Sequence, residues 1–115
     1  RVVIFAGGTG NPYFTTDTCA ALRALDIEAE AILMAKHGVN GVYSADPRTN
    51  DKAEFFTEIT FKDMIKKDLR VMDQTTISLV ADRNIEIIVF SMADIENFRR
   101  AIDGEKVGTK ITKGA

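Results

Sequence analysis

Thr9-Gly-Asn-Pro-Tyr-Phe-Thr-Thr-Asp17 is the stretch around which the rest of the sequence is organised. It follows a short apolar run, Val2–Ala6, that predicts a buried strand, and it leads into Thr16–Leu25, which predicts a helix. A glycine-rich turn between a strand and a helix presents free backbone N–H groups at the helix start, where anions bind. Two threonine hydroxyls and the carboxylate of Asp17 complete a set that suits a phosphorylated ligand. The same residues also fit an ordinary strand-to-helix turn with an aspartate cap.

The composition is that of one globular domain. Of 115 residues, 45% are hydrophobic and 28% are charged. With a net charge of −2, the chain has no excess of basic residues that would favour binding to nucleic acid or an anionic membrane. No apolar run approaches the roughly 20 residues that span a bilayer. The single cysteine, Cys19, excludes an internal disulfide and a cysteine-rich metal site, and we expect it to be a buried structural thiol in a reducing, cytoplasmic compartment.

The start of the sequence adds a further expectation. It opens at Arg1 and passes directly into the predicted strand. A strand that is apolar on both faces needs neighbours on both sides. We therefore expect residues 1–115 to be a single α/β domain that forms part of a longer protein.

Strands and helices alternate along the chain. Glu30–Lys36 predicts a second buried strand, which would complete a right-handed βαβ unit with the first, and Ile85–Phe90 predicts a third. Val107–Thr112 alternates loosely and predicts a final edge strand. This order favours a three-layer α/β/α sandwich with a mainly parallel sheet.

Three helix starts can be predicted from capping residues. Thr60, with Asp63 three positions on, predicts a helix to about Asp68, and Asp73 predicts a cap for a helix that runs through Arg83. Asp94 predicts a cap for a third helix over 95–102, and the inward-facing residues of that helix are expected to be Ile95, Phe98 and Ile102. A further role for Asp73 near a functional site is left open.

Two loops are candidates for the chemistry. In open α/β sheets, ligands bind beyond the carboxyl ends of the strands. Residues 7–17 follow the first predicted strand and residues 37–46 follow the second, so parallel strands would place both loops on one edge. Such convergence suits a two-substrate site and phosphoryl transfer, in which positioning and charge neutralisation do most of the work. The cation that this chemistry needs is missing from the first loop, and no G-x-x-x-x-G-K-[ST] sequence exists.

Several segments of the sequence resemble a known family. Asn40-Gly-Val-Tyr-Ser-Ala-Asp-Pro47 is similar to a pattern of the amino acid kinase superfamily, in which the first residue is usually Asp. Within it, Gly8-Thr-Gly-Asn-Pro-Tyr-Phe-Thr-Thr-Asp17 looks like the UMP-binding loop of the bacterial uridylate kinase family. Ile32–Lys36, Leu69–Asp73 and Gly104–Thr109 agree as well, and the likeness runs to about Lys113.

The resemblance implies roles for the first loop. Backbone groups and Asn11 would lie near the uracil of UMP, and Thr15 or Thr16 near its α-phosphate. Asp17 would be the catalytic residue, because it would orient a lysine and the reacting phosphates. The implied UMP-binding residues are Thr9, Gly10, Asn11, Pro12, Tyr13, Phe14, Thr15 and Thr16.

The resemblance also implies an ATP site and partners. His37, Tyr43 and Asp46 match ATP-contacting positions, with Tyr43 against the nucleoside and Asp46 near the ribose. No residue is expected to bind a metal directly, and Mg²⁺ would arrive with the ATP phosphates. The family's N-terminal half, with its catalytic lysine and much of its hexamer interface, has no counterpart in residues 1–115. We therefore expect these residues to be inactive alone and to belong to a homo-oligomer.

Two rival functions remain open. One is another amino acid kinase with a small carboxylate acceptor, although the Asn11–Asp17 segment is not typical of aspartate and glutamate kinases. The other is a non-catalytic nucleotide-binding module. The retained Asp17 argues against it, whereas the missing lysine region keeps it open.

Overall fold

The computed structural model describes residues 1–115 and contains a four-stranded sheet in the order β1-β5-β6-β4. The strands are β1 (Ala31–Lys36), β4 (Glu58–Thr60), β5 (Glu86–Ser91) and β6 (Thr109–Thr112). β1 runs parallel to β5 and β4 runs parallel to β6, whereas β5 and β6 are antiparallel. The predicted mainly parallel sheet is therefore confirmed, and so are the strands expected at 30–36 and 85–90.

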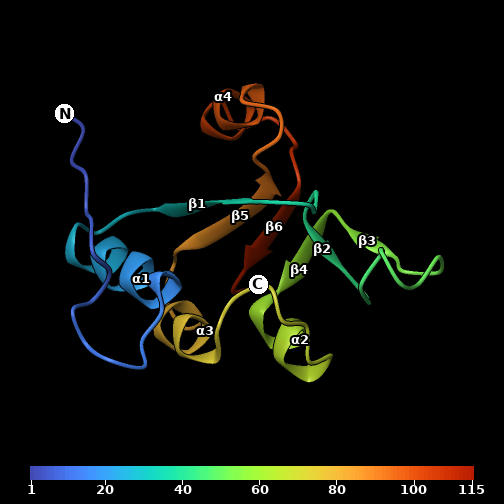
Figure 1. The fold of residues 1–115 in the computed structure, drawn as a ribbon, viewed down its shortest axis with the longest axis horizontal. Coiled ribbons are helices and arrows are strands. Elements are labelled where there is room, and N and C mark those ends of the chain that lie inside the picture. The colour runs from blue at the N-terminus through green and yellow to red at the C-terminus, as the bar shows by residue number, and fades with distance from the viewer.

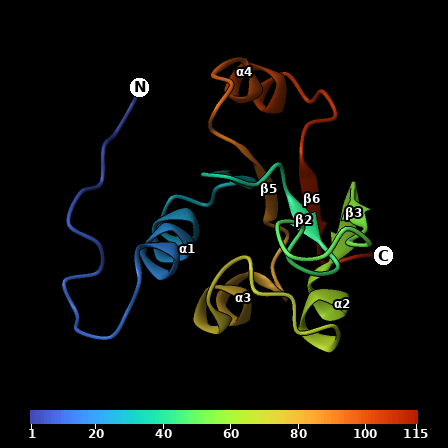
Figure 2. The same ribbon diagram turned by 45° about the vertical axis from the view of Figure 1, so that its right-hand side comes forward.

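Helices lie on both sides of this sheet. α1 (Thr16–Asp26), α2 (Phe61–Lys66) and α3 (Gln74–Val80) occupy one side, and α4 (Glu96–Ile102) occupies the other, as Figure 1 shows. The turned view in Figure 2 keeps the same separation. α1 packs against α3 and lies along β1. The arrangement has the three layers that the alternating sequence predicts. None of the helices combines the length and hydropathy that a membrane crossing requires.

The predicted caps at Thr60 and Asp73 are confirmed. Thr60 accepts a hydrogen bond from the Asp63 backbone N–H at 3.1 Å, and Asp73 accepts one from the Thr76 N–H at 2.8 Å. Each cap satisfies an N–H group that the first turn of a helix leaves without an internal partner. Both helices end earlier than predicted. Asp94 lies one residue before the N-cap of α4, and its carboxylate accepts from the Glu96 N–H at 3.0 Å.

The core lies between the sheet and the layer formed by α1, α2 and α3. Ile87 and Val89 point to this side of β5 and are fully buried, because alternate residues of a strand face the same way. Ile111 from β6 and Ile77 from α3 are buried with them. Burial of each such side chain contributes about 1.5–3 kcal/mol to stability. The core therefore holds the start of α1 at a fixed place beside α3.

A small hairpin extends from the sheet. It consists of β2 (Val42–Tyr43) and β3 (Phe55–Phe56), which are antiparallel and are joined by an exposed polar loop. The hydroxyl of Thr109, a fully buried residue of β6, connects this hairpin to the sheet. It accepts from the Val42 N–H at 2.8 Å and donates to the Phe56 carbonyl at 2.5 Å.

The predicted opening strand over Val2–Ala6 is wrong. The segment forms no strand, and Val2 and Ile4 expose 91% and 88% of their surfaces. It runs apart from the sheet in Figure 1, so the predicted βαβ unit with Glu30–Lys36 is not formed and β1 pairs only with β5. An apolar run predicts a buried strand only where a second layer covers it, and residues 1–115 place no such layer over this segment.

Two further predictions are also wrong. The strand expected at the sheet edge, β6, lies in the interior between β5 and β4. On α4, the three residues expected to face inward are exposed, with Ile95 at 79%, Phe98 at 39% and Ile102 at 73%. The periodicity identified an apolar stripe correctly. It could not reveal that the buried residue of α4 is Ala101, or that the Phe98 ring packs against Phe90 with 5.0 Å between ring centres.

Candidate functional site

The loop that leads into α1 follows a path that ordinary residues rarely take. Gly7, Gly8 and Gly10 all have positive φ, between 67° and 87°, and Tyr13 has φ of 69°. The glycines adopt this left-handed region without a steric penalty, whereas Tyr13 carries some strain there. The Thr9 hydroxyl accepts from the Asn11 N–H at 3.0 Å and so closes a turn inside the loop. The Tyr13 side chain is fully exposed, which leaves its ring available to a ligand.

The first turn of α1 is built from three of the predicted site residues. Thr15 is the N-cap, so the alternative of an aspartate cap at this turn does not hold. The Thr15 hydroxyl accepts from the Thr18 N–H at 3.4 Å. Thr16 is exposed, and Asp17 is half-buried in the first turn. An exposed hydroxyl and a carboxylate beside free helical N–H groups can orient a charged ligand.

Asp73 joins this turn although it lies 55 residues from Thr18. Its carboxylate accepts from the hydroxyls of Thr15 and Thr18, the latter at 3.2 Å, and from both the N–H and the hydroxyl of Thr76. Partial burial would raise the pKa of Asp73, but the hydrogen bonds from Thr15, Thr76 and Thr18 hold that pKa below its ordinary value. Asp73 therefore connects the start of α3 to the start of α1.

The second predicted loop leaves the carboxyl end of β1. His37 is exposed, and Tyr43 is half-buried with its ring edge-on to Phe55, at 5.1 Å between ring centres. Asp46 is exposed and pairs with Arg48, whose Nε lies 3.1 Å from its Oδ1. Hydrogen bonds from the Arg48 side chain and backbone lower the pKa of the Asp46 carboxyl.

The two loops remain separate in their hydrogen bonding. Apart from bonds within the start of α1, the first reaches only to Asp73, and the second is connected to the β2–β3 hairpin and, through Val42, to Thr109. α1 and β1 run in opposite directions, so the first turn of α1 and the carboxyl end of β1 are directed the same way (Figure 1). The assigned roles of Thr9–Thr16, Asp17, His37, Tyr43 and Asp46 remain predictions.

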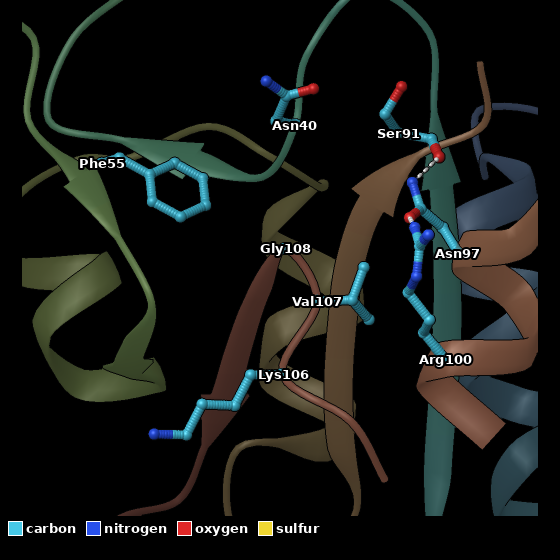
Figure 3. A pocket seen from close by; sticks show the side chains of 8 residues that line it. All are labelled: Asn40, Phe55, Ser91, Asn97, Arg100, Lys106, Val107 and Gly108. Atoms are coloured by element: carbon cyan, nitrogen blue, oxygen red, sulfur yellow. Dashed lines mark hydrogen bonds between the residues drawn. The ribbon is translucent and has the colours of Figure 1, made fainter. Parts of the chain in front are cut away.

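Two cavities are lined by none of these residues. One, of about 440 Å³, lies where β5 ends and β6 begins. In Figure 3, Asn97 and Arg100 approach it from α4, and Asn97 donates to the Ser91 carbonyl at 2.9 Å. Its lining residues are Asn40, Phe55, Ser91, Asn97, Arg100, Lys106, Val107 and Gly108.

The sequence analysis did not identify this cavity. The available signal was the position of Asn97–Arg100 after a predicted strand end, where α/β sheets bind ligands. A second, larger hollow of about 900 Å³ is bordered by glutamates, among them Glu58 and Glu86, and by Lys110. Within the chain, no group of three or more His, Cys, Asp or Glu side chains is arranged to hold a metal ion.

Residues 1–91 match the amino acid kinase family, and the chain belongs to that family. Among solved structures, it is similar to the UMP kinase from Bacillus anthracis, with 37% identity over 94% of this chain and a TM-score of 0.89. It is similar also to the UMP kinase from Ureaplasma parvum, with 42% identity over 92% and a TM-score of 0.85. The uridylate kinase from Archaeoglobus fulgidus matches at 33% identity over 92%, with a TM-score of 0.77. The chain spans 44%, 45% and 50% of these three chains, respectively.

Proposed function

We propose that this chain is the part of a UMP kinase that carries the UMP loop and the ATP-contacting residues. The reaction would transfer the γ-phosphoryl group of ATP to UMP, giving UDP and ADP, as a step of pyrimidine nucleotide biosynthesis. The observation that carries the proposal is the segment Thr9–Asp17 at the start of α1. Support comes from three UMP or uridylate kinase structures that match more than nine-tenths of the chain at 33–42% identity.

In this proposal the first loop binds the acceptor. Asn11 and the loop backbone contact the uracil, and hydroxyl and N–H donors at the start of α1 neutralise the α-phosphate. Asp17 orients the catalytic lysine and the reacting phosphates and is therefore the catalytic residue of this chain. Because phosphoryl transfer depends on alignment and charge neutralisation, these residues contribute mainly by positioning.

The second loop binds the donor. Tyr43 packs against the nucleoside of ATP, Asp46 lies near the ribose, and His37 lies beside the nucleotide. Mg²⁺ enters on the ATP phosphates, because Mg²⁺ commonly takes only one or two carboxylates from a protein. The ion would neutralise charge on the moving phosphoryl group. We place the protein in the cytoplasm, as a homo-oligomer.

The decisive experiment measures ADP release by the intact natural polypeptide with Mg-ATP and three acceptors: UMP, aspartate and glutamate. Turnover with UMP alone is expected. Turnover with a carboxylate acceptor would instead favour another member of the amino acid kinase family.

The non-catalytic alternative has its own test. Calorimetric titration of the intact polypeptide with UMP and with ATP would show binding in either case. Binding without ADP release would identify a nucleotide-binding module. The isolated residues 1–115 are expected to release no ADP, and turnover by them would contradict our assignment of the lysine to another part of the enzyme.

A further inference from the structure

The carboxylate of Asp73 is surrounded by threonine side chains from two helices. It accepts hydrogen bonds from the hydroxyls of Thr15 and Thr18 at the start of α1, and from the hydroxyl and the backbone N–H of Thr76 at the start of α3. Thr18 and Thr76 are buried, with 2% and 0% of their surfaces exposed. A single carboxylate therefore serves as the cap of α3 and as the anchor of the turn that ends the Thr9–Thr16 loop.

Hydrogen-bond donors can be counted in this cluster. A threonine hydroxyl has one proton to donate, and an ionised carboxylate can only accept. The Thr15 proton is donated to Asp73, while its oxygen accepts from the Thr18 N–H. The Thr15 hydroxyl consequently has no proton left for an anion at the helix start. Thr16 is exposed, its hydroxyl is absent from the hydrogen bonds of the cluster, and its methyl group lies about 3.9 Å from where a Cβ on Gly8 would stand.

We propose that Asp73 is a positioning residue for the Thr9–Thr16 loop, because it takes up the Thr15 hydroxyl and leaves the Thr16 hydroxyl to donate to the acceptor's phosphate. The inference rests on the proposed function for the identity of that acceptor. The division of roles between two adjacent threonines follows from the geometry alone. Asp73 acts through Thr15 and does not itself contact the ligand.

The first test needs no ligand and no activity. Amide hydrogen exchange is measured on the intact polypeptide and on Asp73→Asn, which retains the shape but loses one acceptor oxygen. Exchange of the amides in residues 9–18 should rise about tenfold, because the anchor of this turn is lost. Asp94→Asn is the matched control, since Asp94 also accepts from a helix-start N–H but has no contact with the loop. Unchanged exchange in Asp73→Asn would overturn the proposal.

The second test separates the two threonines kinetically. Thr15→Val and Asp73→Asn should each raise KM for UMP about tenfold, with KM for ATP changed less than about twofold. The double variant should bind UMP no more weakly than either single variant, because each of them breaks the bond between Thr15 and Asp73 through which Asp73 acts on the loop. Thr16→Val should also raise KM for UMP, but its effect should add to that of Asp73→Asn. Additive effects of Thr15→Val and Asp73→Asn would refute the connection between them.

A third variant covers the case in which Asp73→Asn does not fold. Thr15→Ser keeps the hydroxyl and should restore both the slow exchange and the low KM for UMP that Thr15→Val loses. Failure of Thr15→Ser to rescue would show that the methyl group, and not the hydrogen bond to Asp73, fixes the loop. If the intact protein releases no ADP with UMP, the proposed function fails, and the exchange measurement still decides the role of Asp73.

Discussion

The hydroxyl of Thr109 lies 2.8 Å from the backbone nitrogen of Val42, from which it accepts a hydrogen bond across 67 residues of sequence. The same hydroxyl donates to the Phe56 carbonyl, and Thr109 is fully buried. One side chain thus satisfies a polar group on each strand of the β2–β3 hairpin. The hairpin carries Tyr43, so the bond also fixes one wall of the predicted ATP site.

Thr109→Val should detach this hairpin from the sheet. Valine keeps the shape but leaves the buried N–H of Val42 and the Phe56 carbonyl without partners, which costs about 1–3 kcal/mol. Thr109→Ser retains the hydroxyl and should cost less. Urea unfolding of both variants measures the difference, and equal stability of the two would show that the hydroxyl contributes nothing.

Gly108 and Gly104 form a matched pair for a test of close packing. Both have positive φ, but a Cβ on Gly108 would stand 1.9 Å from the Val89 carbonyl oxygen, whereas one on Gly104 would meet nothing within 4 Å. Gly104→Ala should cost about 1–2 kcal/mol from the left-handed backbone alone. Gly108→Ala should cost about 1–3 kcal/mol more, because the strand backbone must move. Thermal unfolding would contradict this if both variants lost the same stability.

The Asp73 carboxyl should make stability depend on acid pH. Its pKa is lower in the folded chain than its ordinary value of 3.8, so the folded state binds this proton more weakly than the unfolded state does. The stabilisation is therefore present above the ordinary pKa and is lost as the pH falls through the folded pKa. The loss of stability between about pH 7 and about pH 3 should be smaller in Asp73→Asn than in the natural protein. An identical loss, measured by urea unfolding at each pH, would show that Asp73 does not contribute.

Asp17→Asn should impair catalysis without unfolding the protein. Asp17 is half-buried at the start of α1, and its proposed role is to align charged groups. Misalignment of reacting groups costs about 100-fold in rate, so kcat with UMP and ATP should fall by about that factor. Asp26→Asn is the control, because Asp26 ends the same helix in an ion pair with Arg23. An unchanged kcat in Asp17→Asn would show that Asp17 has no part in the reaction.

Tyr43→Ala should weaken ATP binding selectively. The Tyr43 ring packs against the Phe55 ring with 5.1 Å between ring centres, and its proposed role is to contact the nucleoside of ATP. Loss of a stacked aromatic side chain should raise KM for ATP about tenfold and leave KM for UMP unchanged. Tyr43→Phe keeps the ring and should behave like the natural protein. A change in KM for UMP alone would show that Tyr43 contacts UMP and that its assignment to ATP is wrong.

Local rules predicted much of the fold. The strands at Ala31–Lys36 and Glu86–Ser91 and the caps at Thr60 and Asp73 depend on side-chain period and on hydrogen bonds within three residues. Such signals act over short distances, so one sequence is enough to read them. The burial of Cys19 could be predicted for the same reason.

The failures all concern neighbours that are distant in sequence. Val2–Ala6 and the apolar stripe of α4 have the pattern of buried elements, but burial depends on a covering layer that the pattern does not identify. β6 was expected at an edge because its alternation is weak, yet Ile111 is fully buried between two strands. In the candidate site, the cap at Asp73 was predictable, whereas its bonds to Thr15 and Thr18 depend on the packing of α1 against α3.

The outer side of β1 is an open strand edge that favours self-association of this chain. β1 is bonded to β5 along one side only, and its other side presents unpaired backbone donors and acceptors. Such a side acts as a template for any extended peptide, including the same strand of another molecule. Residues 1–115 produced alone should therefore aggregate at high concentration. A polypeptide that adds a strand against β1 would satisfy its unpaired backbone groups and prevent this aggregation.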